Sequence, residues 1–457
     1  MVNKRAYKRI SVNVIDRNQL LEAALAGGNT GTVLGLDIAK DEIIGCVRWG
    51  TGVFERPWRI VNPKEIRILV ELCLFLKSKC DGFSVALEST GTYGDAARYA
   101  FTQASISIQR ISGKAVSDYS EIFDKVPSQH DGKDAAMIAE LAAFGKGTLW
   151  PYTALSESQQ KINHQVRRIG ALRTQQTQWT GRLEALVAKH WPELTSQLKL
   201  GSVTLLKMLG AYGSPAHALA DPRLALKLAK WGRSPMTHEK VSGVMESAKT
   251  TMGLPMGEPD ADWVKEVASE TLKAFREVRN CDQNLRELIA SDSVMARYSD
   301  AVGASTLAVI WSKLGDPIEY SSSGAFVKAI GLNLKEISSG KRKGELGISK
   351  RGPSQARRWI FYWAMRAVQR PEFATWYKEF TRVGSVRSKS AGGHRKMKGL
   401  IALMRKLCKA LWHVRQHGKD FDYAKVIESI SASPPRRRRR RKGSSQQTLG
   451  PAPNPGI

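Results

Sequence analysis

The chain has 457 residues, 42% of them hydrophobic, and its 71 Lys and Arg residues against 42 Asp and Glu residues give a formal net charge of +29. This length and composition exclude a wholly disordered chain and suffice for two to four domains with buried cores. Without the seven consecutive cations at positions 436–442, the rest of the chain still carries +22. We therefore expect a polyanionic partner, first nucleic acid and second an anionic membrane surface.

Cysteine usage and hydropathy restrict the setting further. The five cysteines form no C-x-x-C pair and do not cluster with the eight histidines, which argues against a thiolate metal site and a disulfide framework. No apolar stretch approaches the roughly 20 residues of a membrane span, and the basic N-terminus lacks the apolar core of a signal peptide. The expected setting is the cytoplasm, without a membrane partner.

After a basic extension over residues 1–30, the chain alternates strand and helix signals up to residue 150. This alternation predicts a mixed α/β domain of the ribonuclease H type, opened by a meander of short antiparallel strands. The predicted strands are 33–38, 42–49, 53–60, a run ending at Glu88, and 105–110; the predicted helices are 63–79 and 95–104.

Four acidic residues lie where such a sheet would place a catalytic centre. Asp37 and Glu88 each close an apolar strand, and Asp131 with Asp134 open an apolar helix over residues 135–144. Carboxylates suit Mg²⁺, and two ions about 4 Å apart can clamp the attacking and leaving oxygens of a phosphoryl displacement. In the alternative interpretation, Asp131 caps the helix and Asp134 complements its dipole. Asp37 and Glu88 favour the metal site, because such carboxylates are costly to desolvate without a cation.

The apolar spacing in residues 151–292 predicts a helical, coiled-coil-like arm that projects from the sheet domain. A long helix over residues 156–190 is interrupted by amides at 174–178, so it is expected to pair with a partner helix or to lie along a nucleic acid. A second helix over residues 262–290 could return antiparallel to it, with the segment 252–260 as the turn or linker.

Residues 293–430 predict a mostly helical domain that contains a basic loop. Within residues 331–352, glycines and small hydroxyl residues lie among lysines and arginines, so the loop can approach a phosphate backbone closely; a solvated loop is the alternative. The aromatic residues at 359–363 could stack on bases, although packed core side chains are the more common case. The tail over residues 431–457 has the composition of a disordered segment that binds nucleic acid nonspecifically.

The order of these motifs resembles the bridge-RNA-guided recombinases of the "one-ten" insertion-sequence family, the DEDD transposases. Three acidic motifs match the family's RuvC-like domain, at residues 35–37, 87–91 and 131–135, and two serine motifs match its C-terminal transposase domain, at residues 339–340 and 349–352. The resemblance covers residues 31–425.

The resemblance implies a composite active site. Asp37, Glu88, Asp131 and Asp134 would bind two Mg²⁺ ions, and Ser339 would be the nucleophile, with Ser338 as the alternative. The acidic residues and the serine could come from one chain or from two protomers. The active unit would then be a dimer or tetramer. Basic residues in and after the loop are expected to bind nucleic acid: Lys341, Arg342, Lys343, Lys350, Arg351, Arg357 and Arg358.

The implied partners are donor and target double-stranded DNA and a structured noncoding bridge RNA, at the bacterial nucleoid. The implied reaction is RNA-guided recombination through a covalent phosphoserine. Three alternatives stay open: a Mg²⁺-dependent, RuvC-like, structure-selective nuclease; a DNA invertase of the same chemistry without a guide RNA; and a noncatalytic RNA-binding scaffold with a decayed sheet.

Overall fold

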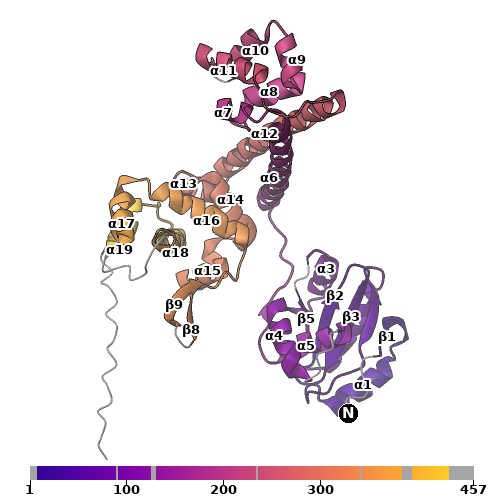
Figure 1. Ribbon diagram of the computed structural model, residues 1–457. Helices are drawn as coiled ribbons and strands as arrows, with labels where there is room; N and C mark the ends of the chain where they lie inside the picture. Colours follow the sequence, from indigo (N-terminus) through magenta and orange to yellow (C-terminus); the bar gives the residue numbers. More distant parts are fainter. Residues whose placement is uncertain are drawn as a thin grey trace, which may run out of the picture. The chain divides into compact units, whose positions relative to one another are not determined.

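The computed structural model describes residues 8–88, 91–124, 130–232, 235–339, 342–382 and 394–431. The chain divides into two compact units, Met1–Ala154 and Leu155–Ile457, whose helices and strands are shown in Figure 1. Within the described residues, no helix combines the length and the apolar character that a membrane crossing requires.

The first unit is built on a seven-stranded sheet with the order β1-β4-β3-β2-β5-β6-β7. The meander prediction is confirmed, because β2, β3 and β4 pair antiparallel while β5 and β6 continue the sheet in parallel. The strands are β1 (Ile10–Ser11), β2 (Val33–Ile38), β3 (Glu42–Arg48), β4 (Trp58–Val61), β5 (Ser84–Glu88), β6 (Ser107–Ile111) and β7 (Thr148–Leu149).

Helices cover both faces of this sheet, which explains why its central strands read as continuous apolar runs. Along β2, Leu34 and Leu36 join one core, whereas Val33 joins a second core on the opposite face, together with side chains of α5. The helices of this unit are the 3₁₀ helix η1 (Val12–Val14), α1 (Arg17–Gly27), α2 (Ile66–Lys79), α3 (Asp95–Gln103), α4 (Gly113–Phe123) and α5 (Asp131–Ala143). The basic extension thus contributes β1 and α1 to the sheet unit.

The second unit contains a pair of long helices, α6 (Glu157–His190) and α12 (Glu258–Ser291). They run antiparallel, since Ile162 of α6 shares a core with Ile289 of α12, and Val187 shares another with Val264. The predicted return helix is therefore confirmed, and α12 is the partner that the amide-rich α6 requires.

Residues 252–257 lie in no helix, in agreement with the predicted turn or linker. No individual element was predicted for residues 191–251, whose described part holds further helices: α7 (Leu194–Gln197), α8 (Val203–Tyr212), α9 (Pro215–Ala220), α10 (Leu224–Trp231) and α11 (His238–Lys249). These helices share a core with the neighbouring ends of α6 and α12. The other end of the arm shares the core of the C-terminal helices, so the arm is part of the second unit (Figure 1).

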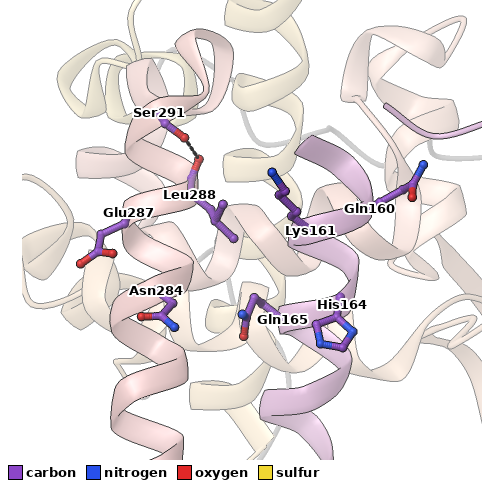
Figure 2. A pocket seen from close by; sticks show the side chains of 8 residues that line it. All are labelled: Gln160, Lys161, His164, Gln165, Asn284, Glu287, Leu288 and Ser291. Carbon is purple, nitrogen blue, oxygen red and sulfur yellow. Dashed lines mark hydrogen bonds between the residues drawn. The ribbon is translucent and has the colours of Figure 1, made fainter. Parts of the chain in front are cut away.

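An open pocket of about 670 Å³ lies between the beginning of α6 and the end of α12. Figure 2 shows its lining, which mixes amides and charged groups, including Gln165 and His164 from α6 and Asn284 and Glu287 from α12. The two helices therefore diverge at this end, where α12 passes into the C-terminal helices.

The C-terminal part of the second unit is mostly helical, as predicted, and packs around one large core that includes Trp363. The predicted loop at residues 331–352 is instead an antiparallel hairpin of β8 and β9 with a register shift between Ile337 and Ser339. The elements are α13 (Ser293–Val302), α14 (Ala304–Leu314), η2 (Pro317–Glu319), α15 (Ser323–Ile330), β8 (Leu334–Ser339), β9 (Arg342–Ile348), α16 (Ser354–Ala367), α17 (Pro371–Thr381), α18 (His394–Gln416) and α19 (Tyr423–Ser431).

Candidate active site

Asp37 and Glu88 are neighbours on adjacent strands of the first unit. The parallel pairing of β2 with β5 aligns Leu36 with Leu87, so the next position on each strand carries a carboxylate. Because side chains alternate between the faces of a strand, Asp37 lies on the face opposite Leu36, and Glu88 on the face opposite Leu87. Both carboxylates therefore lie on the face that α5 covers.

The helix α5 crosses this face at very short range. A Cβ atom on Gly35 would lie 2.1 Å from the carbonyl oxygen of Ala135 and 2.5 Å from the amide nitrogen of Ala139. Only a residue without a side chain permits this approach. Since Ala135 follows Asp134 directly, the contact brings the N-terminal end of α5 to the strand that carries Asp37.

The capping alternative for Asp131 is wrong. The N-cap residue of α5 is His130, whose Nδ1 accepts a hydrogen bond of 3.1 Å from the amide of Lys133. Asp131 and Asp134 both lie in the first helical turn, where they face the helix dipole favourably. Their carboxylates are thus not needed to cap the helix.

The four carboxylates interact electrostatically. Burial raises the pKa of Asp37 to about 6, and the charges of Asp134, Asp131 and Glu88 contribute to the rise. Burial and then Asp134 raise the pKa of Glu88, while burial and then Asp131 raise the pKa of Asp134. An acidic group whose pKa rises in this way is unfavourable in its charged form, so the cluster favours a bound cation.

Glu88 is also held against the beginning of α4. A Cβ atom on Gly113, the first residue of that helix, would lie 2.1 Å from Oε1 of Glu88. A helix N-terminus attracts negative charge, so α4 provides a partial counter-charge for this carboxylate. Helix α4 was not predicted from the sequence.

Two cations near the cluster were also missed. Arg9 links two carboxylates, with Nη1 donating to Oε2 of Glu42 (2.6 Å) and Nη2 donating to Oδ2 of Asp131 (2.5 Å). Lys133, within the third acidic motif, is fully buried, and its Nζ donates to Oδ1 of Asp124 (2.6 Å). Lys133 could have been found from the sequence, because it lies between Asp131 and Asp134. Arg9 could not, since no local pattern links it to Asp131, 122 positions away.

The chemistry of this donor set fits Mg²⁺, which prefers carboxylate oxygens. Across the described residues, no three His, Cys, Asp or Glu side chains are gathered closely enough to hold an ion. The carboxylates nevertheless interact, because the charges of Asp131, Asp134 and Glu88 contribute to the raised pKa of Asp37.

The predicted nucleophile lies in the second unit. Ser339 is the last residue of β8, and its backbone pairs with Arg342 of β9 across the end of the hairpin. For residues 337–339 and 342–345 the structure describes the backbone but not the side chains. Residues 340–341, which include Lys341, lie outside the described residues. Ser338, Ser339, Arg342 and Lys343 are therefore placed by their backbone alone.

The base of the hairpin is held by backbone hydrogen bonds. The amide of Lys350 donates to the carbonyl of Gly331 (3.0 Å), and Nη1 of Arg357 donates to the carbonyls of Ile330 (3.1 Å) and Gly352 (2.6 Å). Lys350 adopts a positive φ of 56°, which is strained for a residue with a side chain. Arg357 thus joins α16 to the end of α15, next to the hairpin, while the side chains of Lys350, Arg351 and Arg358 are exposed.

Both predicted parts fall within known transposase domains. The DEDD-type IS110 model, described as "Transposase", matches residues 34–192, and the model "Transposase IS116/IS110/IS902 family" matches residues 298–378. The chain is also 28% identical over 153 residues to the transposase for insertion sequence element IS1328 of Yersinia enterocolitica. That match covers 32% of this chain and 42% of the relative. Two parts of the chain, residues 34–192 and 298–378, are therefore similar to the domains of IS110-family transposases.

Proposed function

We propose that this protein is an RNA-guided DNA recombinase that moves an insertion sequence by cutting and rejoining donor and target DNA. The observation that carries the proposal is the acidic cluster, in which Asp37, Glu88 and Asp134 all have raised pKa values on one face of the sheet. The strand order and the helix over Gly35 support a RuvC-like fold for this unit. The two transposase-domain matches support the same reaction class.

The four carboxylates Asp37, Glu88, Asp131 and Asp134 would hold two Mg²⁺ ions. When bound, these ions would supply Lewis-acid stabilisation of the phosphoryl oxygens and lower the pKa of the attacking hydroxyl. To hold a metal ion, Asp131 would have to give up its ion pair with Arg9. This change is inexpensive, because an ion pair at the surface contributes about 0–1 kcal/mol.

Ser339 is the proposed nucleophile. Its Oγ would form a bond to the scissile phosphorus and lose its proton to a nearby carboxylate or to water, while the 3′ oxygen of the cut strand would leave as a hydroxyl. The phosphodiester energy would thus be kept in a phosphoserine. A 3′ hydroxyl from the other DNA would then attack this phosphorus and return the serine to its free form.

The remaining parts of the proposal concern partners. The basic residues Lys341, Arg342, Lys343, Lys350, Arg351 and Arg358 would contact phosphates, and a bridge RNA would select target and donor. The active unit would be a dimer or tetramer, so that the hairpin and the acidic cluster meet within one chain or between chains. A DNA invertase without guide RNA would use the same chemistry.

A metal-dependent nuclease is the second candidate, and one observation favours it: the acidic cluster is complete within the first unit, without the hairpin. Such an enzyme would use water as the nucleophile and release free ends.

Trapping the protein on cleaved donor DNA distinguishes the candidates. We expect a covalent adduct on denaturing gels from the wild type and from Ser338→Ala, and none from Ser339→Ala. Asp37→Asn should abolish cleavage because it removes a charged ligand. Cleavage to free ends that is unaffected by Ser339→Ala would establish the nuclease instead, and an adduct lost only in Ser338→Ala would move the nucleophile by one position.

The RNA partner needs a separate measurement. Sequencing of RNA that copurifies with the protein should yield one defined noncoding species. A random sample of cellular RNA would contradict the guide and favour the invertase or the nuclease.

A further inference from the structure

The helix α18 carries four cations on one face. At 100° per residue, Lys398, Arg405, Lys406 and Lys409 fall within about a third of the helix circumference, and we call these four residues the α18 cationic face. The opposite side of the helix is buried in the large core through Leu403, Leu407 and Leu411, among others. The cationic face extends over roughly 17 Å of helix, at 1.5 Å per residue.

These cations lack the acidic partners that other basic residues of the unit have. Arg415, on the same helix, forms a bidentate pair with Asp316 at 3.0 and 2.7 Å. Among the described residues, no acidic side chain forms an ion pair with any of the four cations. Nε of Arg405 is buried and lacks any hydrogen-bond partner within the described part of the chain. Within the described ranges, the charge of the face is therefore not compensated by acidic side chains.

This arrangement is costly for the folded protein alone. Arg405, Lys406 and Lys409 are all partly buried. Burial lowers the pKa of Arg405, and burial followed by the charges of Lys409 and Arg405 lowers the pKa of Lys406. Desolvated like charges repel one another, and a buried donor without a partner costs further free energy. A ligand with several negative charges would offset the repulsion between these cations.

The position of α18 indicates which polyanion it meets. The helices on either side of the serine hairpin, α15 and α16, both pack against α18. The α18 helix therefore lies against both helices between which the hairpin is inserted in the chain, which makes the substrate of the hairpin the first candidate for the cationic face. Phosphate oxygens accept hydrogen bonds from arginine and lysine, and such contacts fix the orientation of a bound duplex.

We propose that the α18 cationic face binds the phosphate backbone of the DNA duplex on which the Ser339 hairpin acts. The choice of DNA over RNA rests on the proposed function. Contacts to phosphates carry no base information, so this binding is expected to be independent of base sequence.

The test is salt-dependent binding of the full-length protein to a fluorescent DNA duplex. Each lost phosphate contact lowers the slope of log K against log salt by about 0.9. We expect the combined variant Arg405→Gln, Lys406→Gln and Lys409→Gln to lower the slope by roughly 2.7. A matched control removes three cations that already have acidic partners: Lys161→Gln, Lys249→Gln and Lys273→Gln, whose partners are Glu157, Glu246 and Glu270. This control should change the slope by less than about one.

Two further measurements complete the test. The melting temperature of the α18 variant should stay the same or rise, because the substitutions remove mutual repulsion, and the charge-retaining variant Arg405→Lys, Lys406→Arg and Lys409→Arg should recover most of the slope. If the glutamine variant fails to fold, Lys409→Gln alone should still lower the slope by about 0.9.

An unchanged slope in a folded glutamine variant would overturn the proposal, and so would a loss of affinity for structured RNA with normal DNA binding. Ser339→Ala should bind the duplex like the wild type. Failure of the phosphoserine mechanism would therefore leave this binding test intact.

Discussion

At the scale of single residues, the site consists of carboxylates whose negative charge is destabilised by burial and by one another. Asp37 is the clearest case, since burial and three neighbouring carboxylates bring its pKa to about 6. Arg9 on Asp131 and the first turn of α4 beside Glu88 offset part of the negative charge. Carboxylates that destabilise the folded protein in this way are typical of sites that bind a ligand.

The raised pKa of Asp37 predicts that the stability of the metal-free protein depends on pH. A carboxyl group with a raised pKa binds protons more tightly in the folded state, so its contribution to stability increases as pH falls from about 7 towards 4. Asp37→Asn should therefore raise the free energy of unfolding at pH 8 by about 1–2 kcal/mol, after allowance for solvent screening, and by less at pH 5.

Urea unfolding in the presence of a chelator measures this effect. Asp118→Asn, at an exposed position paired with Lys114, is the control and should change stability by less than about 0.5 kcal/mol. A loss of stability in Asp37→Asn at pH 8 would show that the carboxylate charge is compensated within the protein.

At the scale of elements, glycines decide how closely the parts of the site approach. Gly35 lets α5 lie directly on β2, and the same contact carries Asp131 and Asp134 towards Asp37. The obstacle that a side chain would meet there is backbone on both sides, which cannot move aside as a side chain could. Helix position and metal-ligand position are therefore coupled through one residue.

We expect Gly35→Ala to destabilise the protein by about 1–3 kcal/mol, because the added methyl group overpacks the interface. Displacement of α5 should also weaken Mn²⁺ binding, measured by calorimetry in the same samples. Gly181→Ala on α6 is the matched control, since its Cβ atom would meet nothing within 4 Å. It should stabilise the protein by roughly 0.5–1 kcal/mol through helix propensity. Normal Mn²⁺ binding by a folded Gly35→Ala protein would contradict this coupling.

At the scale of the whole molecule, the two compact units are joined by one short connection. Residues 151–156 lie in no helix or strand and are exposed to solvent, and Leu155 stands at the unit boundary. Each unit has hydrophobic cores of its own. Units of this kind fold separately when the connection is cut.

Limited digestion with chymotrypsin tests this independence. Among the described residues, the first cut should follow Tyr152 or Leu155, which are both exposed in the connection, because an exposed segment in no helix or strand opens at little cost. Both fragments should then remain folded, each with a cooperative thermal transition by circular dichroism. Earlier digestion inside the sheet, or unfolding of either fragment on cleavage, would contradict this expectation.

The sequence by itself determined the strands that carry Asp37 and Glu88, the helix that begins at Asp131 and the long helices of the arm. These elements follow from local burial patterns, whose periods of 2 and 3.6 residues are visible in any window of the chain. Only the tertiary structure decided the register of Leu36 with Leu87, the approach of α5 over Gly35, the hairpin in place of a loop and the five helices of residues 191–257. It also decided that Arg9 meets Asp131 and that the α18 cationic face lacks acidic partners in the described structure. The reason is physical: such features depend on which distant surfaces fit together, and a contact between residues far apart leaves no signal in the local sequence.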